Sequence, residues 1–193
     1  MTCWFIADTH LGHFNILRFC NRPFKTIEEH DETIINNWNS VVRPDDTVYH
    51  LGDFAFRSAR DPNQYAKRLN GKKFLILGNH DKHLPDKEFT ILGHYHVLKQ
   101  AVFGRNSDDP PLIVLCHYPF SSWASAFHGS YHLFGHVHGR SAAYDTNSLR
   151  LDVGVDCHHF YPISYDEVKV LMKAKNWRKD ERDGVFPATG DDV

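Results

Sequence analysis

The sequence predicts an α/β domain in which short buried strands alternate with helices. Its 193 residues have an ordinary globular composition, with 41% hydrophobic and 24% charged residues. Short runs of apolar residues each end in a polar cluster, which is typical of strands covered on both faces. Segments with apolar residues at helical spacing separate some of these runs, and this alternation indicates a layered α/β fold.

Six segments carry the pattern of a buried strand. Each is a run rich in β-branched, aromatic or aliphatic residues that glycine or polar residues bound. We therefore predict strands at 4–7, 47–51, 74–77, 112–116, 131–134 and 149–155.

Two helices are predicted between the early strands, at 26–42 and 58–70. The first begins with Thr26 and Glu29, which have the spacing of a T-x-x-E capping box. The second is expected to stop at Gly71, because glycine is the residue most often found just beyond a helix end.

A third helix is predicted at 164–175, with Val168, Leu171 and Met172 on one face. The polar stretch that follows, 176–193, has scattered glycine and proline and is expected to be poorly ordered. We therefore place a single domain at 1–175 and treat the remainder as a tail.

Charge and cysteine usage exclude several classes of protein. There are 22 Lys and Arg against 24 Asp and Glu, a formal net charge of −2, which argues against nucleic acid as a partner. The four cysteines show no C-x-x-C spacing, which favours a reducing compartment. No apolar run reaches the ~20 residues of a membrane helix, and the N-terminus lacks the features of a signal peptide. We expect a cytoplasmic protein without membrane contact.

Histidine is unusually frequent, with 15 in the chain, and several follow the predicted strands. Asp8 and His10 follow the first strand at i and i+2, and His136 and His138 follow the strand at 131–134 with the same spacing. In an extended backbone, i and i+2 side chains point to the same side, so we expect each pair to converge on one ion or on two adjacent ions.

The strand ends together supply more ligands than one ion needs. Two carboxylates, four imidazoles and one amide are available, from Asp8, His10, Asp53, Asn79, His117, His136 and His138. A zinc ion usually takes four ligands, so seven favour two ions that share a bridging carboxylate. Asp53, which follows Gly52, is the expected bridge. Mixed nitrogen and oxygen ligation suits Mn, Fe, Zn or Ni, and we favour Mn.

Five motifs in order, D-x-H, G-D, G-N-H-D, a lone histidine after a strand, and G-H-x-H, span residues 8 to 138. In this the chain resembles the calcineurin-like metallophosphoesterase superfamily. The flanking sequence at 12–16 and 117–119 is similar to that of a small bacterial and phage-type subgroup of this superfamily.

The resemblance implies a four-layer αββα sandwich with a dinuclear metal site at the carboxyl ends of the strands. One ion would be held by Asp8, His10, Asp53 and His138, and the other by Asp53, Asn79, His117 and His136. His80 would be the catalytic histidine, and Asp81 its orienting carboxylate. From the residues alone, a turn position explains Asp81 equally well.

The expected activity is hydrolysis of phosphomonoesters or phosphodiesters by a hydroxide that two metal ions activate. His80 would act as general acid or stabilise the transition state. Two alternatives are kept, a nuclease acting on DNA or RNA and a non-catalytic metal-binding module. The expected partner is a small phosphorylated molecule, with a nucleotide as one candidate, and no residue pattern specifies an oligomeric state.

Further residues near the motifs are candidates for substrate contact: His13, Asn15, Arg22, Arg57, Trp123 and His128. His132 is weighed in the same way. His50 lies within a predicted strand and is expected to be a core residue. The others are expected at the surface or in loops: His30, His83, His94, His96, His158 and His159.

Overall fold

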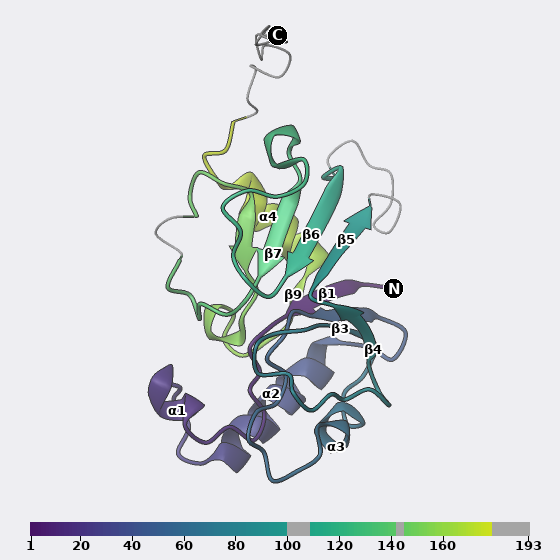
Figure 1. The fold of residues 1–193 in the computed structure, drawn as a ribbon, viewed down its shortest axis with the longest axis vertical. Coiled ribbons are helices and arrows are strands. Elements are labelled where there is room, and N and C mark those ends of the chain that lie inside the picture. The colour runs from purple at the N-terminus through teal and green to yellow at the C-terminus, as the bar shows by residue number, and fades with distance from the viewer. Residues whose placement is uncertain (100–108, 142–144, 179–193) are drawn as a thin grey trace, which may run out of the picture.

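Two mixed sheets face each other across the main hydrophobic core (Figure 1). The computed structural model describes residues 1–99, 109–141 and 145–178. In chain order the elements are β1 Cys3–Ile6, α1 Ile16–Phe19, α2 Ile27–Val41, β2 Thr47–His50, α3 Pro62–Ala66, β3 Lys72–Ile76, β4 Thr90–Gly93, β5 Tyr95–Lys99, β6 Leu112–Cys116, η2 Ala126–His128, β7 Tyr131–Phe134, β8 Arg150–Asp152, η4 Val155–Cys157, β9 Ile163–Ser164 and α4 Tyr165–Lys173.

The first sheet has the order β4-β3-β2-β1-β9, and the second has the order β5-β6-β7-β8. Strands β1 to β4 run parallel, and β9 is antiparallel to β1. In the second sheet β6, β7 and β8 are parallel, while β5 is antiparallel to β6. The carboxyl ends of the parallel strands therefore lie at one edge of each sheet, where the predicted ligands follow them.

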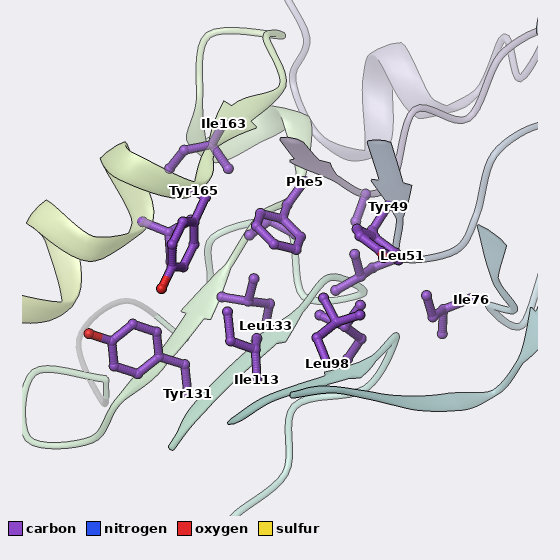
Figure 2. Packing of buried hydrophobic residues seen from close by; sticks show 14 of the residues in the cluster. Phe5, Tyr49, Leu51, Ile76, Leu98, Ile113, Tyr131, Leu133, Ile163 and Tyr165 are labelled. Carbon is purple, nitrogen blue, oxygen red and sulfur yellow. The ribbon is translucent and has the colours of Figure 1, made fainter. Parts of the chain in front are cut away.

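The core between the sheets is built from alternate residues of the strands. Phe5 of β1, Tyr49 of β2, Ile113 of β6 and Leu133 of β7 all point into it, as Figure 2 shows. Tyr165 of α4 adds its ring to the same cluster, next to Phe5. Removing this apolar surface from water stabilises the pairing of the sheets, at roughly 25 cal/mol per Å².

Helices α2 and α3 cover the outer face of the first sheet (Figure 1). Trp38 of α2 is fully buried there, against a cluster that includes Ile6 of β1, and its indole N–H donates to the carbonyl of Asn70 at 3.0 Å. On the outer face of the second sheet, the ring of His132 stacks on Phe120, which comes from the loop after β6.

This arrangement gives three of the four layers that the αββα prediction specifies. In the described part of the chain, the fourth is formed by the loop 118–130 with its short 3-10 helix η2, not by an α-helix.

The six predicted strands are all present, with ends that differ by up to three residues, and the structure adds three more. Strands β4 and β5 were not predicted because they lie at the edges of the two sheets, where Gly93 and two histidines interrupt the apolar pattern. The predicted strand at 149–155 is shorter in the structure because this segment crosses from the second sheet to the first. The Val153 N–H donates to the Phe134 carbonyl after β7, and the Val155 N–H donates to the Ala7 carbonyl after β1.

Helix α2 agrees with its prediction, although its capping box is only half formed. The Thr26 hydroxyl accepts from the Glu29 N–H at 3.1 Å, but the Glu29 carboxylate accepts from Lys25 rather than from Thr26. Helix α3 is much shorter than the predicted 58–70, since Asp61 caps it and Pro62 takes its first position. Helix α1, a single turn at Ile16–Phe19, was not predicted.

One surface expectation is wrong. His30 is fully buried, because its ring lies between the Asp31 carboxylate and the Arg22 guanidinium. Leu171 is 40% exposed, whereas Val168 and Met172 of the same helix are buried. His50 is a core residue as expected, and its Nε2 lies 2.9 Å from the Thr9 hydroxyl.

The tail expected to be poorly ordered is 176–193, and its residues 179–193 lie outside the described residues. At its beginning, the Asn176 N–H donates to the Thr146 carbonyl at 2.9 Å, and Trp177 packs against the main core. Within the described ranges, no helix has the length and apolar character to cross a membrane.

The packing of α4 predicts a contrast between two valines of this helix. Val168 has no exposed surface, whereas Val170 is 67% exposed. Val168→Ala leaves a cavity and should lower the free energy of unfolding by about 2 kcal/mol. The matched control Val170→Ala should change it by less than about 0.5 kcal/mol. Urea unfolding measures both, and equal losses would contradict the described face of the helix.

Candidate metal centre

The predicted ligands lie just beyond the carboxyl ends of five strands. Asp8 and His10 follow β1, Asp53 follows β2, and Asn79 follows β3. The remaining ligands follow two strands of the second sheet, with His117 after β6 and His136 and His138 after β7. The site is therefore assembled from both sheets.

Five of these seven residues have left-handed backbone conformations: Asp8, His10, Asp53, His136 and His138. A residue with a Cβ atom pays about 1 kcal/mol or more for this conformation, and such strain clusters at functional sites. The prediction that an extended backbone makes i and i+2 converge is therefore wrong in its cause. Asp8 and His10 converge through left-handed turns beyond the strand.

Close packing of the loops requires glycine at two positions. At Gly52, with φ of +93°, a Cβ atom would lie 2.7 Å from Nδ1 of His117. At Gly135, a Cβ atom would lie 2.5 Å from the Oδ2 atom of Asp8. Both distances are shorter than van der Waals contact, so these glycines allow the ligand loops to approach one another.

Asp53 occupies the centre of the cluster. Its Oδ2 atom lies 3.5 Å from Nε2 of His10 and 3.5 Å from Nε2 of His117. Its Oδ1 atom accepts the backbone N–H of His80 at 2.9 Å. Burial would raise the pKa of Asp53, but the hydrogen bond and charge of His117, the charge of His10 and the His80 N–H bring it below its usual value. The carboxylate thus stays ionised between two imidazoles, as a bridging ligand requires.

On one side of Asp53, ligand atoms of Asp8, His10 and His138 lie within 4.8 Å of one another. Oδ1 of Asp8 and both ring nitrogens of His10 are buried and have no hydrogen-bond partner among the residues that the structure describes. Leaving a buried polar atom unpaired costs about 1–3 kcal/mol, so these atoms fit a cation. Burial also raises the pKa of Asp8 to about 7 and lowers the pKa of His10.

On the other side of Asp53, the Nε2 atom of His117 faces two oxygen atoms, one from Asn79 and one from Asp53. Its Nδ1 lies 2.8 Å from the carbonyl of Leu51 and donates to it, which leaves Nε2 toward Oδ1 of Asn79 at 3.2 Å and toward Asp53. Burial would lower the pKa of His117, but the hydrogen bond to Asp53 and the charges of Asp8 and Asp53 raise it. A neutral imidazole here would point a lone pair at two acceptors, so a proton or a metal ion must occupy this position.

His136 completes this side. The centroid of its ring lies 5.1 Å from that of His117, and its backbone N–H donates to Oδ2 of Asp8 at 2.8 Å. Asp8 therefore connects the two ligand groups through the backbone as well as through its charge.

Asp156 is a residue that the sequence analysis missed. Its Oδ2 accepts from Nδ1 of His138 at 2.7 Å, and its two oxygens accept from the guanidinium of Arg22 at 2.8 and 2.7 Å. Burial would lower the pKa of His138, but the hydrogen bonds of its ring to Asp156 and Cys20 and the charge of Asp8 raise it to about 10. A carboxylate behind a ligating histidine orients the ring and makes it a better ligand. Asp156 follows the apolar run 153–155, so the rule that found the other ligands also applies to it.

Arg22 is fully engaged inside the protein. Besides Asp156, its guanidinium donates to the carbonyls of Asp8 and Thr9 and to the ring of His30. The expectation that Arg22 contacts substrate is therefore wrong, because it holds the loop that carries the first two ligands.

The prediction that Asp81 orients the His80 ring is also wrong. Its carboxylate accepts three backbone N–H groups, from Asp53 at 2.8 Å, Phe54 at 2.9 Å and Gly78 at 2.8 Å. Asp81 ties the loop after β3 to the loop after β2. The His80 ring instead lies against Phe56, with the centroids 4.1 Å apart, and 5.6 Å from His10.

Two of the remaining substrate candidates lie near this centre. The ring of His13 is 5.4 Å from His10 and 6.5 Å from His80. Burial, with the nearby charges of His80 and Arg57, lowers the pKa of His13 to about 4. The Arg57 guanidinium lies over the Phe56 ring at 5.1 Å. Asn15 is exposed at the N-cap of α1, and its side chain makes no capping hydrogen bond there.

Two other candidates are not brought to the centre. His128 precedes β7, whereas the ligands follow that strand, so it lies toward the opposite end of the sheet. The indole N–H of Trp123 donates to Ser130, and its ring contacts His132 on the outer face of the second sheet. His132 is held in the same way, with Nδ1 3.2 Å from the Val114 carbonyl. These placements follow from the loop 118–130, which covers the outer face.

Proton competition predicts how metal affinity depends on pH. Below pH 7 the Asp8 carboxyl, whose pKa is raised to about 7, is protonated in the metal-free protein, and His138 is protonated up to about pH 10. A metal ion must displace both protons below pH 7 and the His138 proton above it. The affinity for Mn²⁺ should rise with pH, by about tenfold per unit for each proton displaced, and more steeply below pH 7. Calorimetric titration from pH 5.5 to 8.5 measures this, and a flat profile would contradict it.

The contact between Asp156 and His138 predicts a second effect on metal binding. Asp156→Asn removes the charge behind the ring and should weaken Mn²⁺ binding by roughly 10- to 100-fold. Asp166→Asn, which changes an exposed carboxylate on α4, is the matched control and should leave the affinity unchanged. Equal affinities in the two variants would show that Asp156 does not support the centre.

Comparisons with known proteins agree with this geometry. Residues 1–140 match the family described as Calcineurin-like phosphoesterase. The chain is 34% identical over 179 residues to an uncharacterized protein of Methanocaldococcus jannaschii, covering 89% of this chain and 92% of the other, and 30% identical over 194 residues to the Gene 66 protein of Mycobacterium phage L5, covering 88% and 93%. A crystal structure of a protein of unknown function from Aquifex aeolicus is similar, with a TM-score of 0.67 and 27% identity over 88% of this chain and 98% of that one. The chain therefore belongs to the calcineurin-like phosphoesterase family.

Proposed function

We propose that the protein hydrolyses phosphomonoesters or phosphodiesters with two divalent metal ions. Mn²⁺ is the ion that we favour at both positions. The observation that supports this most is the position of Asp53, whose Oδ2 lies at the same 3.5 Å from Nε2 of His10 and of His117. A carboxylate placed between two imidazoles in this way suits a bridge between two ions.

The donor set fits two such ions. Asp8, His10, Asp53 and His138 would hold one, and Asp53, Asn79, His117 and His136 would hold the other. When bound, a pair of divalent ions binds the phosphoryl oxygens and makes a water molecule nucleophilic at neutral pH. The two carboxylates offset only half of the charge of the pair, so the site attracts phosphate although the chain has a net charge of −2.

His80 is the residue that we assign to proton transfer. Its backbone N–H is held by Oδ1 of Asp53, and its ring stands beside His10 while remaining partly exposed to the solvent from which a substrate arrives. In this position His80 can donate a proton to the leaving oxygen of the ester. Phe56 limits the movement of the ring by packing against it.

The complete set of proposed ligands, together with His80, argues against the alternative of a non-catalytic metal-binding module. Each of the seven ligand positions carries a residue able to bind a metal, and His80 is present beside them. A module that only binds metal has no requirement for the imidazole of His80, which we do not assign as a ligand.

His80→Ala should separate catalysis from metal binding. With p-nitrophenyl phosphate or bis-p-nitrophenyl phosphate and Mn²⁺, kcat should fall by about 10²- to 10³-fold, because a positioned general acid contributes this much. The metal content, measured by mass spectrometry, should stay at two ions. His94→Ala, which removes an exposed imidazole in the turn between β4 and β5, is the control and should keep its kcat.

Two results would contradict this proposal. Wild-type protein shown to bind two ions but unable to hydrolyse either ester with any divalent metal would overturn the activity. Loss of metal from His80→Ala would overturn the role given to His80.

A further inference from the structure

A large pocket adjoins the metal centre and has no role in the function proposed above. Its volume is about 790 Å³. It lies between the segment after β2 and the segment after β3, and it is lined in part by Phe56, Arg57, Arg60, Asn63, Lys82 and Lys87.

The pocket shares a wall with the centre. Phe56 lines the pocket, and the centroid of its ring lies 4.1 Å from that of the His80 ring. Lys82, another lining residue, donates its backbone N–H to the carbonyl of His80 at 2.8 Å. A molecule bound at the centre beside His80 would therefore lie next to this pocket.

The pocket carries a local positive charge that the whole chain lacks. Four cationic side chains line it, and only two carboxylates, those of Asp61 and Asp86, do so. Oδ1 of Asp61 is already engaged by the backbone N–H and the side-chain amide of Asn63. Across the described ranges, none of the four cations is in an ion pair. This excess of positive charge contrasts with the net charge of −2 for the chain.

The backbone that carries these cations is held in place. The Asn63 side chain accepts the Lys87 N–H at 3.0 Å and donates to the Leu84 carbonyl at 3.4 Å, which joins the two walls of the pocket. The Ser58 hydroxyl accepts the Arg60 N–H at 2.9 Å. Arg57 has a left-handed backbone, with φ of +50°, a conformation that residues other than glycine rarely adopt.

We propose that this pocket binds a second phosphate group of the substrate while the first is at the metal centre. The inference rests on the proposed function and narrows it, since it names the substrates as esters that carry two phosphates. Guanidinium and ammonium groups bind phosphate through charge-assisted hydrogen bonds, and fixed cations at a rim also raise the rate of encounter with anions. The second phosphate can be a terminal monoester of a small molecule or the next diester of a nucleic-acid strand.

A matched pair of chromogenic substrates tests this. Thymidine 5′-(p-nitrophenyl phosphate) and its 3′-phosphorylated form differ only in the second phosphate. We expect kcat/KM to be about tenfold higher for the 3′-phosphorylated ester in the wild type. In Arg60→Gln/Lys87→Gln this ratio should fall to near one. Arg43→Gln/Lys72→Gln removes the same two charges from exposed positions at the opposite end of the first sheet, and it should keep the wild-type ratio.

A binding measurement separates failure of the pocket from failure of the proposed activity. Calorimetry with thymidine 3′,5′-bisphosphate and thymidine 5′-phosphate, in Mn²⁺ and without turnover, should show the same preference in the wild type and its loss in Arg60→Gln/Lys87→Gln. If this holds while neither chromogenic ester is hydrolysed, the activity is wrong and the pocket stands. Equal affinities for the two nucleotides in the wild type, or an unchanged preference in the pocket variant, would overturn the inference.

A short oligothymidylate distinguishes the two sources of the second phosphate. Tighter binding of the oligonucleotide than of the bisphosphate, again lost in the pocket variant, would identify the diester of a strand. Tighter binding of the bisphosphate would identify the monoester of a small molecule.

Discussion

The carboxylate of Asp53 is the group on which the rest of the site depends. One oxygen faces two imidazoles at 3.5 Å each, and the other holds the backbone of His80 at 2.9 Å. Asp53 is itself held in a left-handed conformation by the Asp81 carboxylate, which accepts its N–H. A single side chain therefore sets the spacing of the two proposed ligand groups and the position of the His80 backbone beside them.

Two carboxylates hold the loops that carry the left-handed residues of the site. Asp81 joins the loops after β2 and β3 through three backbone N–H groups, and Asp156 joins Arg22 to His138. Both contacts are partly buried, where charge-assisted hydrogen bonds are strong. These carboxylates set the directions of the proposed ligands by holding the loops and the ring of His138. Substitutions at these positions are thus expected to act through metal affinity and loop order.

The central strands, and the gathering of the proposed ligands beyond their ends, were predictable because each buried strand is an apolar run that ends in a polar cluster. Edge strands β4 and β5 were not, since half-solvated edges carry no continuous apolar run. The role of Asp81 was misread because adjacency to His80 in the sequence does not bring its carboxylate to that ring. The net charge also concealed the basic pocket, because Arg60 and Lys87 come from separate segments that only the fold brings together.

Asp53 is the proposed bridge between the two ions, and anomalous diffraction from crystals loaded with Mn²⁺ tests this most directly. We expect two anomalous peaks roughly 3.5–4 Å apart, each within bonding distance of Asp53. One peak should contact His10 and His138, and the other His117 and His136. A single peak, or two peaks that Asp53 does not join, would contradict the account.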